Sequence, residues 1–265
     1  MDATLLLPAL SLCHRELIRF LRQRSRIIGA LVTPIVFWLL IGGGMGRSFR
    51  AEGLPGGTNF IQYFFPGTIL MILLFTAIFS TISIIEDRKE GFLQGVLVAP
   101  VPRMAIVLGK VLGGTVLAFG QGLLFLLLAP TVGIHLSATA IVLTLLVMLL
   151  VSFALTALGF CLAWRMSSTQ GFHAIMNLFL MPMWFLSGAL FPAGGAMGGL
   201  AWIMRLNPLT YGLAALRRAM YWHDPAASAT MPSFGLSLAV TITFAIAMLV
   251  LASAIAGKTT AADLQ

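Results

Sequence analysis

Charge is the property that this sequence has least of. Only 9% of its 265 residues are Asp, Glu, Lys or Arg, whereas a soluble globular domain carries about 25%. Hydrophobic residues make up 59%, and several uncharged stretches reach the roughly 20 residues that a membrane-spanning helix needs. Ten-residue segments of alternating polarity, which mark an outer-membrane barrel, are missing. The sequence therefore predicts an all-α integral membrane protein.

Other scarcities exclude further classes of site. The two cysteines, Cys13 and Cys161, fall in separate predicted helices, so neither a disulfide nor a thiolate metal site is expected. The four histidines are scattered along the chain and form no metal-binding pattern. The net charge of +8 lacks the basic patches interleaved with aromatics that nucleic-acid binding requires. We assign it instead to cytoplasmic loops and contacts with anionic membrane lipids.

Six membrane spans are predicted, at 27–46, 64–85, 104–129, 138–163, 171–190 and 234–256. An even number of spans places both termini on one side of the membrane. Of the 16 Lys and Arg residues, 11 lie in segments on that side and 5 on the other, so the positive-inside rule predicts cytoplasmic termini. The first span follows a basic helix, which is typical of an uncleaved signal anchor.

A basic amphipathic helix is predicted over residues 8–26. Its arginines recur at spacings of 4, 3 and 4, so that Arg15, Arg19, Arg22 and Arg26 form one stripe. The opposite face carries Leu10, Cys13, Leu17, Phe20 and Leu21. Such a helix lies in the membrane interface. It either anchors the chain or also contributes a docking surface for a cytoplasmic partner.

The densest charge follows the second span, at residues 86–102. Glu86, Asp87, Arg88, Lys89 and Glu90 stand in a row before Gly91. The next residues, Phe92, Leu93, Val96 and Leu97, have the spacing of a helical face, and Pro100 and Pro102 end the segment. We predict a short cytoplasmic helix with a charged N-terminal end, where acidic groups suit the helix dipole. A soluble partner could push on it.

Residues 191–222 are too apolar for a free loop and too rich in Gly and Pro for a regular span. Trp202, Tyr211, Tyr221 and Trp222 are of the types enriched at the membrane interface. We predict short helices that re-enter the membrane from the outer side. Non-helical backbone at that depth must be buried against protein or line a wet cavity.

The spans offer little chemistry. No Asp, Glu or Arg lies deep inside any of them, and Lys110, near the inner end of the third, is expected to snorkel to the interface. The proton or sodium site of a secondary carrier is therefore missing. Ala252–Thr259 (ASAIAGKT) ends like a phosphate-binding loop, but Ala252 replaces the required first glycine. ATP binding through this motif is not expected.

Two polar or small-residue patterns remain within the spans. His173 and Asn177 share a face of the fifth span, with Trp184 not far away. They either make a helix–helix hydrogen bond or contact a substrate. Small residues line one side of the third span at Gly109, Gly113, Gly114, Ala118 and Gly122. This stripe predicts close packing of another helix.

A set of short motifs resembles one transporter family. EDRKEGFLQGVLVAPVPR at 86–103, VLGK at 107–110, FLSGALFP at 185–192 and NPLTYGLAALR at 207–217 occur in this order around six spans. The chain resembles the permease subunits of ABC-2 type exporters, whose cargoes include lipo-oligosaccharides, polysaccharides and antibiotics. The resemblance implies a bacterial inner-membrane permease that pairs with a second, identical permease subunit. It also implies two separate ATPase subunits that hold ATP and magnesium, with no cofactor on this chain.

The resemblance further assigns roles to individual segments. Residues 8–26 resemble the interface helix of the family, 86–102 its coupling helix, and 191–222 its outer re-entrant helices. The implied ATPase-coupling residues are Glu86, Asp87, Arg88, Lys89, Glu90, Gly91, Phe92 and Leu93. The implied outer gate is formed by Asn207, Pro208, Tyr211 and Arg217, and the substrate path by His173, Asn177 and Trp184. One departure is Gln94, where family members often carry Glu.

These features predict an ATP-driven export permease that moves its cargo along the first, second and fifth spans. The expected cargo is lipid-linked, a glycolipid or polysaccharide, or an amphipathic drug-like molecule. Two other classes remain open. A lipid-modifying enzyme would turn over its substrate without an ATPase, and would have to rely on Glu86, Asp87 and Glu90. A channel would conduct ions without ATP.

Overall fold

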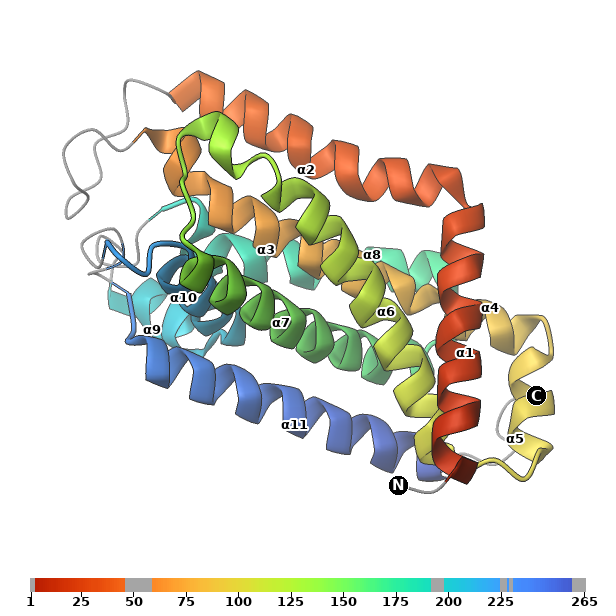
Figure 1. Cartoon of the computed structure of the whole chain (residues 1–265). Coiled ribbons are helices and arrows are strands. Elements are labelled where there is room, and N and C mark those ends of the chain that lie inside the picture. Colours follow the sequence, from red (N-terminus) through yellow and green to blue (C-terminus); the bar gives the residue numbers. More distant parts are fainter. Residues whose placement is uncertain (1–2, 46–58, 192–197, 225–227, 229–230, 259–265) are drawn as a thin grey trace.

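The computed structural model describes residues 3–45, 59–191, 198–224, 228 and 231–258, and this part of the chain is all-helical without β-strands (Figure 1). The elements are α1 (Ala3–Arg22), α2 (Arg24–Met45), α3 (Phe60–Ser80), α4 (Ile82–Lys89), α5 (Phe92–Val98), α6 (Arg103–Leu126), η1 (Ala129–Val132), α7 (Ala138–Trp164), α8 (Thr169–Trp184), η2 (Phe185–Ala189), α9 (Gly198–Leu206), α10 (Pro208–Met220) and α11 (Phe234–Lys258).

Six helical stretches of the described chain are long and apolar enough to cross a membrane. They are Ile27–Gly44, Phe60–Lys89, Arg103–Leu126, Ala138–Trp164, Thr169–Ala189 and Phe234–Lys258. Each overlaps one predicted span, so the six-span prediction is confirmed. The agreement arises because a single apolar segment of this length can satisfy the hydrogen bonds of its backbone in lipid only as a helix.

Helix α3 forms the centre of the bundle. It packs against α2, α6 and α7, and almost every side chain from Phe60 to Ile78 is buried. Helices α2 and α11 lie at the periphery, where leucine, isoleucine and valine side chains such as Leu40 and Val250 are largely exposed. An apolar surface around a buried core is what a lipid solvent favours, because lipid tails give no reason to bury such side chains.

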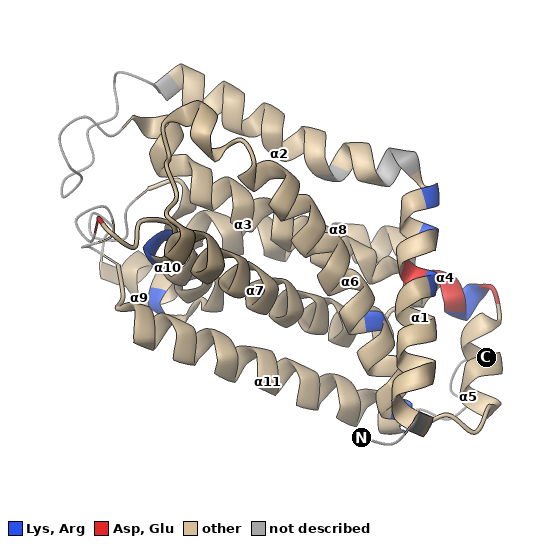
Figure 2. Cartoon of the chain, in the orientation of Figure 1, with Lys and Arg blue, Asp and Glu red and all other residues tan. Residues whose placement is uncertain are grey.

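The two ends of the bundle differ. Helix α1 crosses one end almost perpendicular to the spans, and α4 and α5 project beyond it (Figure 1). We call this the α4–α5 end. The opposite end carries α9 and α10, and we call it the α9–α10 end. Most of the charged ribbon segments lie at one end or the other, whereas the middle of the bundle carries almost none (Figure 2).

The predicted interface helix was too long by several residues at its C-terminal end. Helix α1 ends at Arg22, and Arg24 already begins α2. Arg26 therefore belongs to the start of α2, just before the first span, and its side chain lies outside the described part of the chain. The amphipathic character is present, since Leu7, Leu10 and Leu21 are exposed on α1, as expected of a helix that lies in a membrane interface.

The predicted charged start of the coupling helix is wrong. Glu86, Asp87 and Lys89 are the last turn of α4, which continues the second span, and Gly91 separates them from the apolar α5. Acidic groups at a helix C-terminus oppose its dipole. Cations from other helices must therefore compensate them.

The small-residue stripe of α6 does admit other helices. A Cβ atom built on Gly109 would lie 2.6 Å from Cβ of Leu12, and one on Gly113 would lie 2.8 Å from Cβ of Glu16. Both glycines thus let α1 lie directly on the α6 backbone. Gly122 faces Leu73 of α3 and the end of Met148 of α7 instead. The predicted close packing is present, but these small residues face two sides of α6 rather than the single side that was predicted.

Candidate functional site

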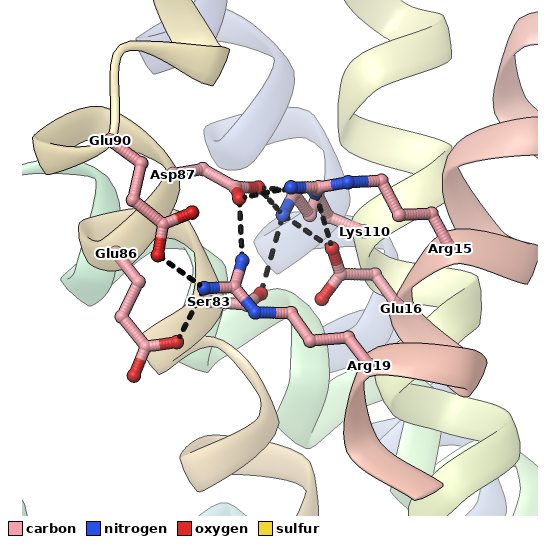
Figure 3. A network of polar contacts seen from close by, with 8 residues as sticks. All are labelled: Arg15, Glu16, Arg19, Ser83, Glu86, Asp87, Glu90 and Lys110. Carbon is pink, nitrogen blue, oxygen red and sulfur yellow. Dashed lines mark hydrogen bonds and ion pairs between the residues drawn. The ribbon is translucent and has the colours of Figure 1, made fainter. Parts of the chain in front are cut away.

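A buried carboxylate, Asp87, organises the α4–α5 end (Figure 3). Its side chain is 0% exposed. Arg15 of α1 donates two hydrogen bonds to it, from Nη1 to Oδ2 at 2.9 Å and from Nη2 to Oδ1 at 2.7 Å. Arg19, one turn later, donates from Nη1 to Oδ1 at 2.6 Å. The hydrogen bonds from Arg15 to Asp87 raise the pKa of Arg15 above its ordinary value, so the guanidinium stays charged.

Lys110 of α6 is the third cation that contacts Asp87. The prediction that it snorkels to the membrane interface is wrong. Its side chain is only 3% exposed. The ammonium group donates to Oε1 of Glu16 at 2.6 Å, to Oδ2 of Asp87, and to Oγ of Ser83 at 3.3 Å. A lysine has three N–H donors, and each of them finds an acceptor here. Burial is tolerated because the charge is paired and fully hydrogen-bonded.

The remaining charged residues of the acidic stretch are more exposed to solvent. Arg19 Nη2 lies 2.9 Å from Oε2 of Glu86 and 3.1 Å from Oε1 of Glu90, whose side chain is 58% exposed. Lys89 and Gly91 are also exposed, whereas Leu93 is buried. Within the predicted ATPase-coupling set, the surface available to a partner therefore comprises Lys89, Glu90 and Gly91, with Glu86, Arg88 and Phe92 partly accessible.

Arg88 points away from this cluster toward the end of α7. Its guanidinium donates to the carbonyl oxygens of Met166, at 2.9 Å, and Trp164. A cation suits the carbonyl groups and the negative dipole at a helix C-terminus. The acidic stretch thus attaches α4 to α1, α6 and α7.

Helix α5 joins this assembly through a turn and two side-chain contacts. Gly91 adopts φ of 77°, a left-handed conformation that favours glycine. The guanidinium of Arg15 lies over the ring of Phe92, 3.6 Å from the centroid. Gln94 donates from Nε2 to the carbonyl oxygen of Arg88 at 3.4 Å, near the end of α4. A glutamate there could not donate this bond, which gives the departure from the family pattern a structural role.

A cavity of ≈ 390 Å³ lies between α2, α3 and α8. Most of its lining is apolar, including Phe75, Phe79 and Met181, and His173 and Asn177 contribute polar groups from α8. Trp184 does not line it. This indole is fully buried and donates from Nε1 to the carbonyl oxygen of Gly67 at 2.9 Å. The cavity is therefore bounded by the three spans that were predicted to border the cargo path.

At the α9–α10 end, the side chain of Tyr221, the residue after α10, replaces a backbone donor that a proline removes. Pro66 has no N–H, so the carbonyl of Gln62 loses its partner within α3. Tyr221 Oη donates to this carbonyl oxygen at 3.1 Å. Arg217, only 3% exposed, donates from Nη2 to the carbonyl oxygen of Tyr63 at 2.9 Å and covers the Tyr63 ring.

The other predicted gate residues have local structural roles. Asn207 caps α10 by accepting from the backbone N–H of Leu209 at 3.0 Å, and its Nδ2 donates to the carbonyl oxygen of Met183 at 2.6 Å. Pro208 occupies the first turn of α10, where its missing N–H costs nothing. Tyr211 donates to the carbonyl oxygen of Arg205 at 2.9 Å. The Asn207 contact thus attaches α10 to α8, and the Tyr211 contact attaches it to α9.

The comparisons with known proteins agree with this architecture. Residues 9–221 match the ABC-2 type transporter family. A relative named as the transport permease ycf38, from Cyanophora paradoxa, is 28% identical over 217 residues, covering 80% of this chain and 73% of the relative. Nodulation protein J of Sinorhizobium fredii is 27% identical over 199 residues, covering 74% of each.

This protein belongs to the ABC-2 type transporter family. It is a multi-pass membrane protein and the transmembrane permease subunit of an ABC transporter. Its role is that of a transport subunit rather than an enzyme. The family implies an ATPase partner.

The sequence analysis missed two members of the charge cluster, Glu16 and Lys110. Glu16 is the sole acidic residue within the basic helix α1, and Lys110 is a lone cation inside an apolar span. Each is unusual in its own segment, and together they indicate a buried ion pair. Their pairing was not visible because 94 residues separate them in the sequence.

Proposed function

We propose that this chain is the permease subunit of an ATP-driven exporter of amphipathic or lipid-linked cargo. The observation that supports it best is α5, a short helix that projects beyond the spans at the α4–α5 end (Figure 1). Its Phe92 ring stacks under the guanidinium of Arg15 of α1. Val98 in its last turn is 74% exposed. In the proposed arrangement, a soluble partner docked on α5 would cover this side chain.

The proposed arrangement places the α4–α5 end and both termini in the cytoplasm. Two ATPase subunits would dock there, one on each of two identical permease subunits. Their surfaces would cover Val98 and the exposed charges of Lys89 and Glu90. This chain would bind neither ATP nor magnesium itself.

The cargo class follows from the cavity between α2, α3 and α8. A mainly apolar lining with hydrogen-bonding groups at His173 and Asn177 suits a molecule with an apolar chain and a polar but uncharged portion. The resemblance to ABC-2 type exporters supports outward transport of such amphiphiles. At the α9–α10 end, Asn207 and Arg217 would hold the exit closed until α10 moves.

The docking assignment is tested by capture of the ATPase from the native host. Tagged wild-type chain and the variant Val98→Asp are purified in mild detergent, and nucleotide hydrolysis by the captured fraction is measured. We expect Val98→Asp to reduce the captured activity at least about tenfold, because docking would bury the new carboxylate in an apolar contact.

The matched control is Gly257→Asp, which adds the same charge on α11 where a new side chain meets no atom within 4 Å. Capture by this control should equal that of wild type. Equal capture by Val98→Asp and Gly257→Asp would refute docking on α5. Absence of ATPase with the wild-type chain would refute the proposed function as a whole.

A further inference from the structure

Lys110, Glu16 and Asp87 bring together three elements that are far apart in the sequence. Lys110 belongs to the spanning helix α6, Glu16 to α1 and Asp87 to the end of α4 (Figure 3). All three side chains are at most 6% exposed. Separating any one helix from the other two would leave a charge buried without its partner, which is far more costly than breaking an exposed ion pair.

The backbone around Lys110 is shaped for this contact. Gly109 precedes it, Gly113 follows one turn later, and both face α1 without a side chain between them. The close approach allows the short side chain of Glu16 to reach the ammonium group at 2.6 Å. A sliding movement of α1 along α6 would break the glycine contact and the ion pair together.

Helix α5 contacts the same cluster through the ring of Phe92. Arg15 donates two hydrogen bonds to Asp87 and covers the ring of Phe92, 3.6 Å from its centroid. A continuous series of side-chain contacts therefore runs from Phe92 of α5 through Arg15 and Asp87 to Lys110 of α6.

We propose that Lys110 is a positioning residue for transport. With Glu16 and Asp87 it fixes α1, α4 and α6 as one rigid body, which we call the charge-locked joint, so that a displacement of α5 moves the spanning helix α6. This inference rests on the proposed function, in which a partner acts on α5. Without the joint, α5 would still bind that partner, but its displacement would be absorbed by rotation of α1 and α4 against α6.

The structural test uses spin labels on α5 and α6, at Val98→Cys and Val116→Cys, in a background where Cys13 and Cys161 are replaced by alanine. Both label positions are exposed. We expect one narrow distance peak in otherwise wild-type protein and loss of that peak in Lys110→Met. The control Lys258→Met removes an exposed lysine from the end of α11 and should retain the narrow peak.

A narrow peak in Lys110→Met would overturn the proposal. Should this variant fail to fold, Glu16→Gln removes the charge from a second member while keeping its shape. It should broaden the same peak, and an unchanged peak would equally overturn the joint.

The functional test measures nucleotide hydrolysis per molecule of cargo in the reconstituted complex. We expect Lys110→Met to capture the ATPase as well as wild type does, but to hydrolyse at least about fivefold more nucleotide per cargo molecule. An unchanged ratio would overturn the coupling role. The spin-label distances are measured without the ATPase, so they test the charge-locked joint independently of the proposed function. Failure of the wild-type chain to capture an ATPase would refute the proposed function, and the distances alone would then decide whether the joint exists.

Discussion

Replacement of Gly109 by alanine tests how closely α1 rests on α6. The added Cβ would lie 2.6 Å from Cβ of Leu12 and 2.8 Å from the carbonyl oxygen of Ala9. Both are backbone or near-backbone atoms, so α1 has to move as a whole. Overpacking of this kind typically costs about 1–3 kcal/mol. The same substitution also stabilises a helix by roughly 1 kcal/mol through its higher propensity.

Gly120 provides the matched control on the same helix, because a Cβ there meets no atom within 4 Å. Gly109→Ala and Gly120→Ala share the propensity gain, so their difference isolates the clash. We expect Gly109→Ala to be less stable than Gly120→Ala by about 1–3 kcal/mol. The measurement is reversible unfolding in mixed micelles, followed by helical circular dichroism. Equal stability of the two variants would refute the close approach of α1.

Two further substitutions test buried polar contacts. Asp87→Asn leaves three cations without their shared carboxylate and should lower the free energy of unfolding by about 3–5 kcal/mol. Glu90→Gln, at an exposed ion pair, should lower it by less than about 1 kcal/mol. Similar losses in the two variants would contradict a buried charge cluster around Asp87. Tyr221→Phe removes the donor that replaces the missing N–H of Pro66 and should cost about 1–3 kcal/mol. Tyr211→Phe removes an exposed hydrogen bond and should cost less, and thermal unfolding in detergent ranks the two.

The six spans were predictable because hydropathy is a local property. Each uncharged run is long enough to cross a bilayer, and no other backbone form satisfies its hydrogen bonds there. The short helix after Gly91 was predictable for a similar reason, since Leu93 and Leu97 have helical spacing and Pro100 follows its end. The resemblance carried by the same stretch agreed with the family that the comparisons identified.

The position of the charges along α4 was predicted wrongly because helix propensity does not show where a span ends. Glu86 and Asp87 were expected to begin a helix, where a dipole would favour them. They instead end one, at the unfavourable end. Arg15, Arg19 and Lys110 compensate for this, but their proximity depends on how α1 crosses the bundle.

The sequence by itself determined that this chain is a six-span helical membrane protein, because composition and run length decide which solvent a segment prefers. It also marked residues 86–98 as unusual by their charge and periodicity. Only the tertiary structure decided that Asp87 is buried, that Lys110 pairs with Glu16, and that Tyr221 supplies a donor to α3. These contacts join residues many turns apart, and the cost of leaving a buried charge or carbonyl unpaired makes each depend on its distant partner.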